Sequence, residues 1–426
     1  MAGPAAALSE PPFRDAARRI TATLLAAQSL GSAGFLAAST VSAIVGAQLS
    51  GRPSWAGVPS AVYQFGAALA AVGWGQAMDR LGRRFMLALG LLCGITGASL
   101  AGGAVVASSF WVLLAGLSLM GAANSALQLA RFVAAEVHPP AERGRAIANV
   151  VIGGTVGAIV GPLLTGPTGR MARARGMDEL AGPYFASAAL FLVAALLILA
   201  RLRPEPREIG RELARFYAAA PGEAAAGPRP LRLILRQGPV RAAMATLVLA
   251  QVVMVMLMVI TSLHMKHHHH PLGSIAAVIS SHVVGMYAFS FVSGRLSDRW
   301  GRGPTIQVGA VGLVLACLTA PLSPAVLPLG LSLFLLGLGW NFCYVGGSAL
   351  LSDQLAPEER ARAQAFNDFV MGAASATGSL GSGWVFATVG YGAMGLVAAA
   401  AALVPIVLAW RLRTPRRPAA AAVPGA

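Results

Sequence analysis

Long apolar segments alternate with short polar stretches along almost the whole chain. Each segment is close to the roughly 20 residues that an α-helix needs to cross a bilayer. The pattern predicts twelve membrane-spanning helices, over residues 20–46, 55–78, 85–107, 110–136, 145–166, 181–202, 239–264, 272–296, 304–321, 325–352, 361–389 and 391–411. Residues 203–238 are rich in Arg, Glu, Pro and Ala and contain no spanning segment. The sequence therefore predicts an all-α membrane protein with two groups of six helices.

Composition agrees with a chain that lies mostly in a bilayer. Of the 426 residues, 56% are hydrophobic and 11% are charged, whereas soluble domains carry about one quarter charged residues. Residues 1–19 are polar and contain Pro, Arg and Asp, so we expect no cleavable signal peptide and a retained first helix. The three cysteines all fall inside apolar segments, which gives no sign of a disulfide framework.

The basic residues are distributed unevenly between the two sides that this topology defines. The chain has 32 Lys and Arg and a net charge of +16, and most of these residues fall in one set of loops, in both terminal segments and in residues 203–238. The positive-inside rule places those segments in the cytoplasm. We interpret the charge as topology and exclude nucleic acid as a partner. The expected location is the cytoplasmic (inner) membrane, with the lipid bilayer as partner and both termini inside.

Five segments follow from this interpretation. They are a cytoplasmic N-terminal tail (1–19), an N-terminal six-helix bundle (20–202), a cytoplasmic linker (203–238), a C-terminal six-helix bundle (239–411) and a cytoplasmic C-terminal tail (412–426).

A short motif occurs once in each half of the chain. Gly75-Gln-Ala-Met-Asp-Arg-Leu-Gly-Arg-Arg84 follows the second segment, and Gly294-Arg-Leu-Ser-Asp-Arg-Trp-Gly-Arg302 follows the eighth. Gly75 permits close contact between helices, and the aspartate can pair with arginines or lie at a helix N-terminus, where the helix dipole favours an anion. We expect these loops to form a charged latch that holds one face shut. The predicted gating residues are Gly75, Asp79, Arg80, Arg83, Arg84, Gly294, Asp298, Arg299 and Arg302.

The doubled motif resembles the signature loop of the major facilitator superfamily, and the resemblance covers essentially the whole chain. It implies twelve transmembrane helices in two six-helix pseudo-repeats, with a substrate cavity between the halves and transport by alternating access. Polar candidates for the cavity wall on segments four and ten are Asn124, Gln128, Asn341 and Cys343. We find no phosphate-binding loop, no nucleophile with its base and no closed zinc spacing, so we expect no enzyme activity.

Methionine and histidine are paired on the seventh and eighth segments. Met254 and Met258 are four residues apart and share one helix face, as do His282 and Met286. Met254 and His282 each lie about 15 Å from the outer ends of their segments, so the two pairs fall at matching depth. Gly285 lies inside the second pair and is expected to let the two helices approach closely.

These four side chains have the chemistry of a copper site. Thioether and imidazole groups suit copper, above all Cu(I). Both are uncharged, so they avoid the roughly 2.5–3.5 kcal/mol cost of placing a charged side chain at the centre of a membrane helix. Ionisable residues inside the bilayer are rare and functional by default. Methionine is also a common filler of apolar gaps, and Met256 is interpreted in that way.

The paired motifs M-x-x-x-M and H-x-x-x-M are similar to those of the CcoA-like copper importers of the major facilitator superfamily. The resemblance implies that Met254, Met258, His282 and Met286 bind copper during import. It also implies that the copper supplies haem-copper oxidase assembly. Copper is then the transported substrate, and no cofactor is expected.

A histidine-rich stretch follows the seventh segment. We expect it at the outer mouth of the cavity, where it either captures copper or forms a solvated polar loop. Lys266, the only lysine, is expected to face water. The residues considered for capture are His264, Met265, His267, His268, His269 and His270.

Two other functions remain open from the sequence. The first is a proton-coupled exporter of small organic compounds, because the glycine row Gly153, Gly157 and Gly161 resembles a motif common in antiporters, although helix packing explains it equally well. Asp368 either relays protons in such an exporter or pairs near the cytoplasmic surface. The second is a membrane metal sensor that does not transport.

Overall fold

A computed structural model describes residues 11–139, 142–217 and 229–411, and these residues form helices without any strand. The predicted tail 412–426 and the first ten residues of the predicted tail 1–19 lie outside the described residues. The helices of the first half are α2 (Pro11–Ser50), η1 (Pro53–Trp55), α3 (Val58–Leu81), α4 (Arg83–Val106), α5 (Phe110–Gln128), α6 (Ala130–Glu136), α7 (Arg143–Leu163), α8 (Thr165–Ala174) and α9 (Ala181–Arg201). Those that follow are α10 (Pro206–Phe216), α11 (Leu231–Ile234), α12 (Gly238–His267), α13 (Leu272–Tyr287), α14 (Ser290–Trp300), α15 (Arg302–Thr319), η2 (Ala320–Leu322), α16 (Val326–Asp353) and α17 (Pro357–Arg411).

The predicted all-helical membrane fold is confirmed. Within the described ranges, 10 helices are long and apolar enough to cross a membrane, or 11 when the pair Pro53–Ala71 and Gly73–Leu81, bent by 43°, counts as one span. Helix α17 has 55 residues and is broken at Gly390, whose φ is 79°. A helix of that length measures about 80 Å, far more than the roughly 30 Å of a hydrocarbon core. It therefore supplies the last two crossings, which brings the number into agreement with the twelve predicted helices.

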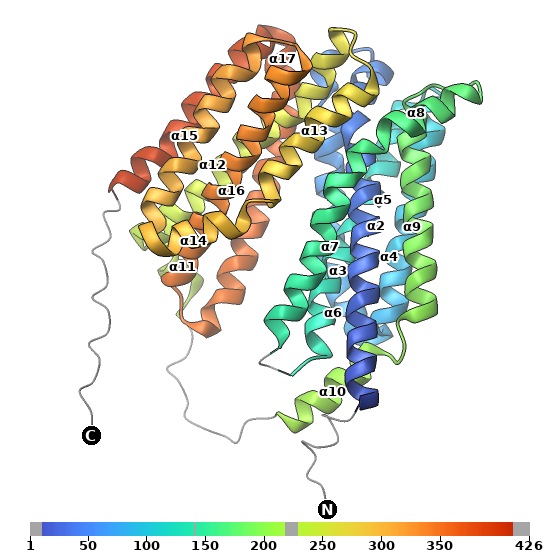
Figure 1. Ribbon diagram of the computed structural model, residues 1–426, viewed down its shortest axis with the longest axis vertical. Coiled ribbons are helices and arrows are strands. Elements are labelled where there is room, and N and C mark those ends of the chain that lie inside the picture. Colours follow the sequence, from blue (N-terminus) through green and yellow to red (C-terminus); the bar gives the residue numbers. More distant parts are fainter. Residues whose placement is uncertain (1–10, 140–141, 218–228, 412–426) are drawn as a thin grey trace, which may run out of the picture.

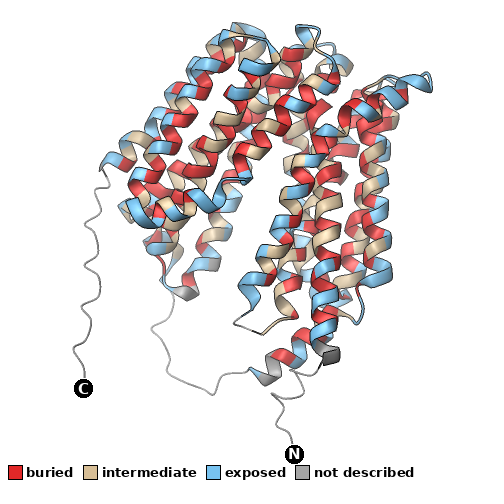
Figure 2. Cartoon of the chain, in the orientation of Figure 1, coloured by how far each residue is buried: buried red, intermediate tan, exposed pale blue. Residues whose placement is uncertain are grey.

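The helices gather into two bundles, α2–α9 and α12–α17, whose ribbons diverge toward the end that carries both termini (Figure 1). Exposed positions lie along the outer sides of both bundles, while buried positions lie inside (Figure 2). Large apolar side chains such as Leu69, Trp111, Leu196 and Trp384 are exposed. Exposed apolar area on this scale requires a covering phase, and hydrocarbon meets that need because helices satisfy their own backbone hydrogen bonds.

The glycine row on α7 is a packing surface against α2. A Cβ added to Gly153 would lie 2.5 Å from the Leu25 carbonyl oxygen, and one added to Gly157 would lie 1.9 Å from that of Ser29. Gly161 meets the Ala33 carbonyl in the same way, at 2.4 Å. Small residues four apart let two membrane helices approach along their whole contact. The row therefore has a structural explanation that needs no transport direction.

In the first motif loop, Arg83 forms two ion pairs. Its guanidinium lies 2.8 Å from Asp79, four residues earlier, and 2.9 Å from Glu136 at the end of α6. Glu136 was not among the predicted gating residues, because it lies more than fifty residues away in the sequence. The pairs tie α3, α4 and α6 together within the N-terminal bundle.

The second motif loop repeats this arrangement. Arg302 lies 2.7 Å from Asp298 and 3.0 Å from Asp353 at the end of α16. Both loops therefore use one arginine to join the motif aspartate to an acidic residue that ends a later helix of the same bundle. Since every partner belongs to its own bundle, neither loop bridges the two halves in this conformation.

The remaining predicted gating residues form no ion pair within the described residues. The close helix contact expected at Gly75 is absent, and the prediction was wrong for this conformation: a Cβ on Gly75 or Gly294 would meet nothing within 4 Å, because the bundles diverge at this end. Arg84 donates to the Leu199 carbonyl at 2.5 Å. The side chains of Arg80 and Arg299 are exposed.

The linker is attached to both bundles at its two ends. At its start, Glu205 accepts hydrogen bonds from the backbone N–H groups of Arg83 (2.5 Å) and Arg84 (3.3 Å), which caps the first turn of α4. At its end, Arg229 pairs with the buried carboxylate of Glu359 in the first turn of α17, at 2.6 Å. Helix α10 lies between these two attachments and α11 follows the second one, in a segment for which no spanning helix was predicted.

The Glu359 contact predicts a pH-dependent stability. The hydrogen-bonded Arg229 guanidinium lowers the pKa of Glu359 from 4.5 to about 2, against the opposing effect of burial, and the backbone N–H groups of Ala356 and Arg229 add to the lowering. A lowered folded-state pKa stabilises the fold above the unfolded pKa, and that stabilisation is lost as the pH falls toward the folded value. We expect Glu359→Gln to melt a few degrees below the wild type at pH 7. The difference in melting temperature between the wild type and Glu359→Gln should become smaller below about pH 4.5.

Melting curves in detergent at several pH values check this expectation. Glu142→Gln is a matched control, because no hydrogen bond or ion pair involves the Glu142 carboxylate within the described residues. A gap between wild type and Glu359→Gln that stays constant from pH 7 to pH 3 would contradict the assignment.

Candidate binding cavity

A cavity lies between the two bundles and consists of two adjoining parts of about 270 and 540 Å³. Helices α2, α3, α5 and α7 wall it from the N-terminal bundle, and α12, α13, α16 and α17 from the C-terminal bundle. The parts share a set of side chains and are therefore continuous. The shared residues are Phe35, Leu36, Ala158, Met286, Tyr287 and Trp340.

Stacked aromatic rings line this cavity from both sides. In the N-terminal bundle, Phe35 and Tyr63 stack with ring centroids 4.2 Å apart. In the C-terminal bundle, Trp340 stacks on Tyr344 at 4.8 Å and meets Tyr287 edge-to-face at 6.4 Å. Aromatic pairs prefer these offset and edge-to-face arrangements. The cavity therefore presents flat apolar surfaces from opposite bundles.

Amide and hydroxyl groups supply the polar part of the wall. Gln251 on α12 accepts a hydrogen bond from the Trp340 indole N–H at 2.9 Å and donates to Ser375 on α17 at 2.8 Å. These bonds fix the indole plane and join α12, α16 and α17 around the cavity. Neither Gln251 nor Trp340 was among the predicted cavity residues.

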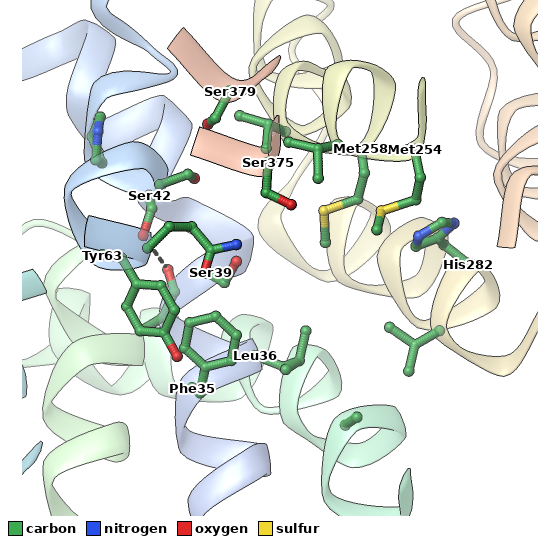
Figure 3. Close-up of a pocket in the computed structure, with 18 of the residues that line it drawn as sticks. Phe35, Leu36, Ser39, Ser42, Tyr63, Met254, Met258, His282, Ser375 and Ser379 are labelled. Carbon is green, nitrogen blue, oxygen red and sulfur yellow. Dashed lines mark hydrogen bonds between the residues drawn. The ribbon is translucent and has the colours of Figure 1, made fainter. Parts of the chain in front are cut away.

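All four residues of the paired Met and His motifs line the smaller part of the cavity. Figure 3 shows the side chains of Met254 and Met258 next to the ring of His282, across the cavity from Phe35 and Tyr63. Met256 is buried and absent from the cavity wall, as interpreted from the sequence.

The ring of His282 is held in one orientation. It is fully buried, and its Nδ1 lies 2.9 Å from the carbonyl oxygen of Leu333. A carbonyl only accepts hydrogen bonds, so Nδ1 carries the proton and Nε2 presents a lone pair. Nε2 is buried without a hydrogen-bond partner. This is the state in which imidazole accepts a hydrogen bond or binds a metal.

The expectation for Gly285 was wrong. A Cβ on Gly285 would lie 2.3 Å from the carbonyl oxygen of Phe334, so the helix that approaches closely is α16 and not α12. Neighbours in a helical bundle need not be neighbours in the chain. The two motif pairs therefore meet because both face the cavity, without tight packing between α12 and α13.

Three of the four predicted cavity residues line the wall, and the amide of one of them is already hydrogen-bonded within the protein. Asn124, Gln128 and Asn341 line the larger part of the cavity. The amide of Asn341 is already used, because it donates to the Met286 carbonyl at 2.6 Å and thereby ties α16 to α13. Cys343 is fully buried outside the cavity, with its sulfur 3.7 Å from the Ile306 carbonyl, so the prediction that it lines the cavity was wrong.

The histidine-rich stretch begins on α12, which continues to His267 instead of ending at the predicted 264, and His268, His269 and His270 follow the helix. His264 stacks on Tyr391 at 4.2 Å and meets the ring of His268 at 4.7 Å. Met265 is fully buried, and His270 lies 2.8 Å from the Pro324 carbonyl through Nε2. The central cavity is lined by none of the six residues considered for capture.

Lys266 was expected to face water, and its side chain is 36% exposed, but it also has an ionic partner. Its ammonium group donates to Glu179 at 2.8 Å, from the C-terminal to the N-terminal bundle. Arg173 also pairs with Glu179. The ion pair lies at the end of the molecule opposite the termini, where α8 and α13 approach each other (Figure 1).

Hydrogen bonds from serine hydroxyl groups to backbone carbonyls join the two bundles at that same end. Ser379 on α17 donates to the Gly57 carbonyl at 2.9 Å, and Ser280 on α13 donates to the Ile159 carbonyl at 3.3 Å. A Cβ on Gly57 would lie only 1.7 Å from the Ser379 carbonyl oxygen. The bundles thus touch at one end of the cavity and diverge at the other, an arrangement that alternating access requires of one of its states.

Two pseudo-equivalent helical bundles around a central cavity, closed at one end, define a multi-pass membrane transporter. The family described as Major Facilitator Superfamily matches residues 21–280 and 243–426. The chain belongs to this superfamily.

Relatives of known sequence cover nearly the full chain. The riboflavin transporter RfnT of Brucella anthropi is 32% identical over 403 residues, which are 93% of this chain and 97% of that protein. The uncharacterized MFS-type transporter YdeG of Bacillus subtilis is 33% identical and covers 89% of both chains. These similarities support membership of the superfamily, but they do not extend to the finer resemblance to copper importers.

Solved structures of similar fold include the nucleoside transporter NupG, with a TM-score of 0.66, 15% identity and coverage of 93% of this chain and 100% of that one. A bacterial homologue of the lysosomal transporter Spinster, inward-facing and occupied, has a TM-score of 0.67 at 14% identity, with 95% of both chains covered. At these identities the likeness concerns the fold alone.

Proposed function

We propose that the chain is a secondary transporter that moves a small, flat, heteroaromatic organic solute across the cytoplasmic membrane by alternating access. The observation that carries this proposal is the pair of aromatic stacks that line one cavity from opposite bundles, Phe35 with Tyr63 and Trp340 with Tyr344. A flat ring between such surfaces gains stacking energy of about 0.5–1.5 kcal/mol per contact beyond the burial of apolar area.

The polar groups of the cavity suit the edges of a heteroaromatic ring. Binding sites for small molecules are mostly apolar, with a few well-placed polar groups that fix orientation. Gln64, Gln251 and Ser39 line the smaller part, and Asn124 and Gln128 line the larger part. The printed name of the relative RfnT, a riboflavin transporter, agrees with a substrate of this kind.

The distribution of arginine along the sequence favours one orientation of the transporter in the membrane. With both termini on the cytoplasmic side, as the distribution of arginine favours, the closed end that contains Gly57 and Ser379 faces outward. The described conformation is then inward-facing.

Binding of flavins to the purified full-length chain tests the proposal. Riboflavin fluorescence is expected to fall on binding, because the ring stacks on aromatic side chains, and lumichrome, which keeps the ring without the sugar chain, should compete. Ribitol, which keeps only the sugar chain, should not. Competition by ribitol, or the absence of any saturable change with riboflavin and lumichrome, would contradict a site for flat rings.

Copper remains a second candidate because of one observation. His282 presents a buried, unpartnered Nε2 beside three thioethers in the same cavity, and its Nδ1 is held by a backbone carbonyl, as in many metal-ligating histidines. Within the described ranges no group of three or more His, Cys, Asp or Glu could hold a metal. A copper site would therefore depend on Met254, Met258 and Met286.

A Cu(I) titration against a chromophoric chelator distinguishes this candidate. If copper is the substrate, Met254→Leu and His282→Ala should each weaken Cu(I) binding by at least about tenfold. Even the loss of a residue that only hydrogen-bonds a metal ligand lowers metal affinity by about that factor. Met256→Leu is the matched control, because that methionine lies outside the cavity wall. Equal Cu(I) affinity in wild type and His282→Ala would rule out copper.

A further inference from the structure

Arg131 is the charged side chain of the cavity. Among the described residues that line its two parts, no other Asp, Glu, Lys or Arg is present. The residue follows a break in the fourth predicted span, where α5 ends at Gln128 and α6 begins at Ala130.

The guanidinium of Arg131 has no acidic partner. It forms no ion pair or hydrogen bond within the described residues, and its Nε is buried without a partner. Its closest aromatic contact is Phe132, with the guanidinium 4.9 Å from the ring centre. A charge that is partly removed from water without a counter-charge is costly, and in a membrane protein such a residue is a candidate for binding.

The carboxylate of Asp368 does not neutralise this charge. Asp368 and Arg131 both lie near Tyr344, yet Asp368 is exposed and accepts a hydrogen bond from Gln364 at 2.9 Å. It is also absent from the cavity wall. An incoming anion would therefore meet Arg131 without displacing an internal partner.

Neutral donors extend the site along α5, the helix that precedes the break. Asn124 and Gln128 precede Arg131 by about two turns and one turn, so the three side chains follow one face, and all three line the larger part of the cavity. An amide and a guanidinium together can surround the oxygen atoms of a carboxylate or phosphate, which accept several hydrogen bonds at once.

The other end of the cavity has the opposite character. The unpartnered Nε2 of His282 accepts hydrogen bonds and does not donate them. Leu333, which holds His282, and Tyr344, which lies near Arg131, are about 16 Å apart along α16 at 1.5 Å per residue. The cavity thus offers an acceptor at one end and a cation at the other, with aromatic rings between them.

We infer that the transported solute is an organic anion, in which a flat ring with an N–H edge is joined to a carboxylate or phosphate. In this arrangement Arg131 binds the anionic group, the aromatic stacks hold the ring, and His282 accepts from the ring edge. The inference rests on the proposed function, because it assumes that the cavity takes a heteroaromatic ring.

Two flavins that differ by one phosphate test this inference on the full-length chain. Riboflavin 5′-phosphate should bind at least about tenfold more tightly than riboflavin, because a hydrogen bond to a charged group contributes more than one to a neutral group. Arg131→Gln should lower the affinity for riboflavin 5′-phosphate far more than that for riboflavin and so remove the preference, and Arg131→Lys should keep part of it. Arg170→Gln, an exposed arginine at the closed end, should change neither affinity.

The outcomes separate the two proposals. Equal affinity of wild type for the two flavins, or an equal loss of both in Arg131→Gln, would overturn the role of Arg131 while leaving the flat-ring site intact. Failure of both flavins to bind would overturn the flat-ring site and, with it, this inference. Saturable riboflavin binding by Arg131→Gln also shows that the variant is folded.

Discussion

Trp340→Ala is expected to weaken flavin binding by at least about thirtyfold, which corresponds to ~2 kcal/mol, the loss typical of a central aromatic anchor. The indole lines both parts of the cavity, stacks on Tyr344 and meets Tyr287 edge-to-face. Its removal also leaves Gln251 without the N–H that it accepts from at 2.9 Å. Fluorescence titration of riboflavin measures the effect.

Two further variants show whether this loss comes from the ring surface. Trp340→Phe keeps an aromatic plane but loses the bond to Gln251, so its affinity should lie between those of wild type and Trp340→Ala. Trp410→Ala removes an exposed indole near the end of α17 and should leave binding unchanged. Wild-type affinity in Trp340→Ala would show that the ring binds elsewhere.

Gly57→Val is expected to reduce transport to background. Gly57 has φ −82°, so valine meets no backbone strain there. Its side chain would, however, occupy the position 1.7 Å from the Ser379 carbonyl oxygen, where the two bundles touch. Because packed helices cannot absorb such an overlap, the variant cannot close this end of the cavity. Uptake of radiolabelled flavin into proteoliposomes measures the loss.

The control for this variant is a valine substitution at Gly103, which lies near the end of α4 and faces open space. Gly103→Val introduces the same side chain where a Cβ meets nothing within 4 Å, so transport should continue. Riboflavin binding should persist in Gly57→Val, because the cavity wall is unchanged and only closure is blocked. Transport by Gly57→Val at the wild-type rate would mean that contact at Gly57 is not part of the cycle.

Membrane constraints explain why the fold could be predicted from the sequence. Lipid requires apolar segments of spanning length, so the alternation of apolar and polar stretches indicates the helices directly. Matching depth placed Met254 and His282 on one cavity wall, since depth follows from helix rise alone. The boundaries were less certain, as the extension of α12 to His267 shows.

Contacts between distant segments could not be predicted in the same way. The pair of Lys266 with Glu179 joins the two bundles, and Arg83 with Glu136 joins α4 to α6; neither follows from spacing in the sequence. Cys343 lies on the same helix as Trp340 but on another face, against α15. Which face of a membrane helix meets a cavity depends on its neighbours in the bundle, and these become visible only in the structure.

Counterflow in proteoliposomes tests the central claim most directly. Vesicles that contain the full-length chain are loaded with unlabelled riboflavin 5′-phosphate and diluted into radiolabelled flavin, and accumulation of label over time is recorded. We predict a transient accumulation that is absent from empty vesicles and from vesicles with Trp340→Ala. Equal label in vesicles with wild type, with Trp340→Ala and without protein would contradict carriage of a flat ring through this cavity.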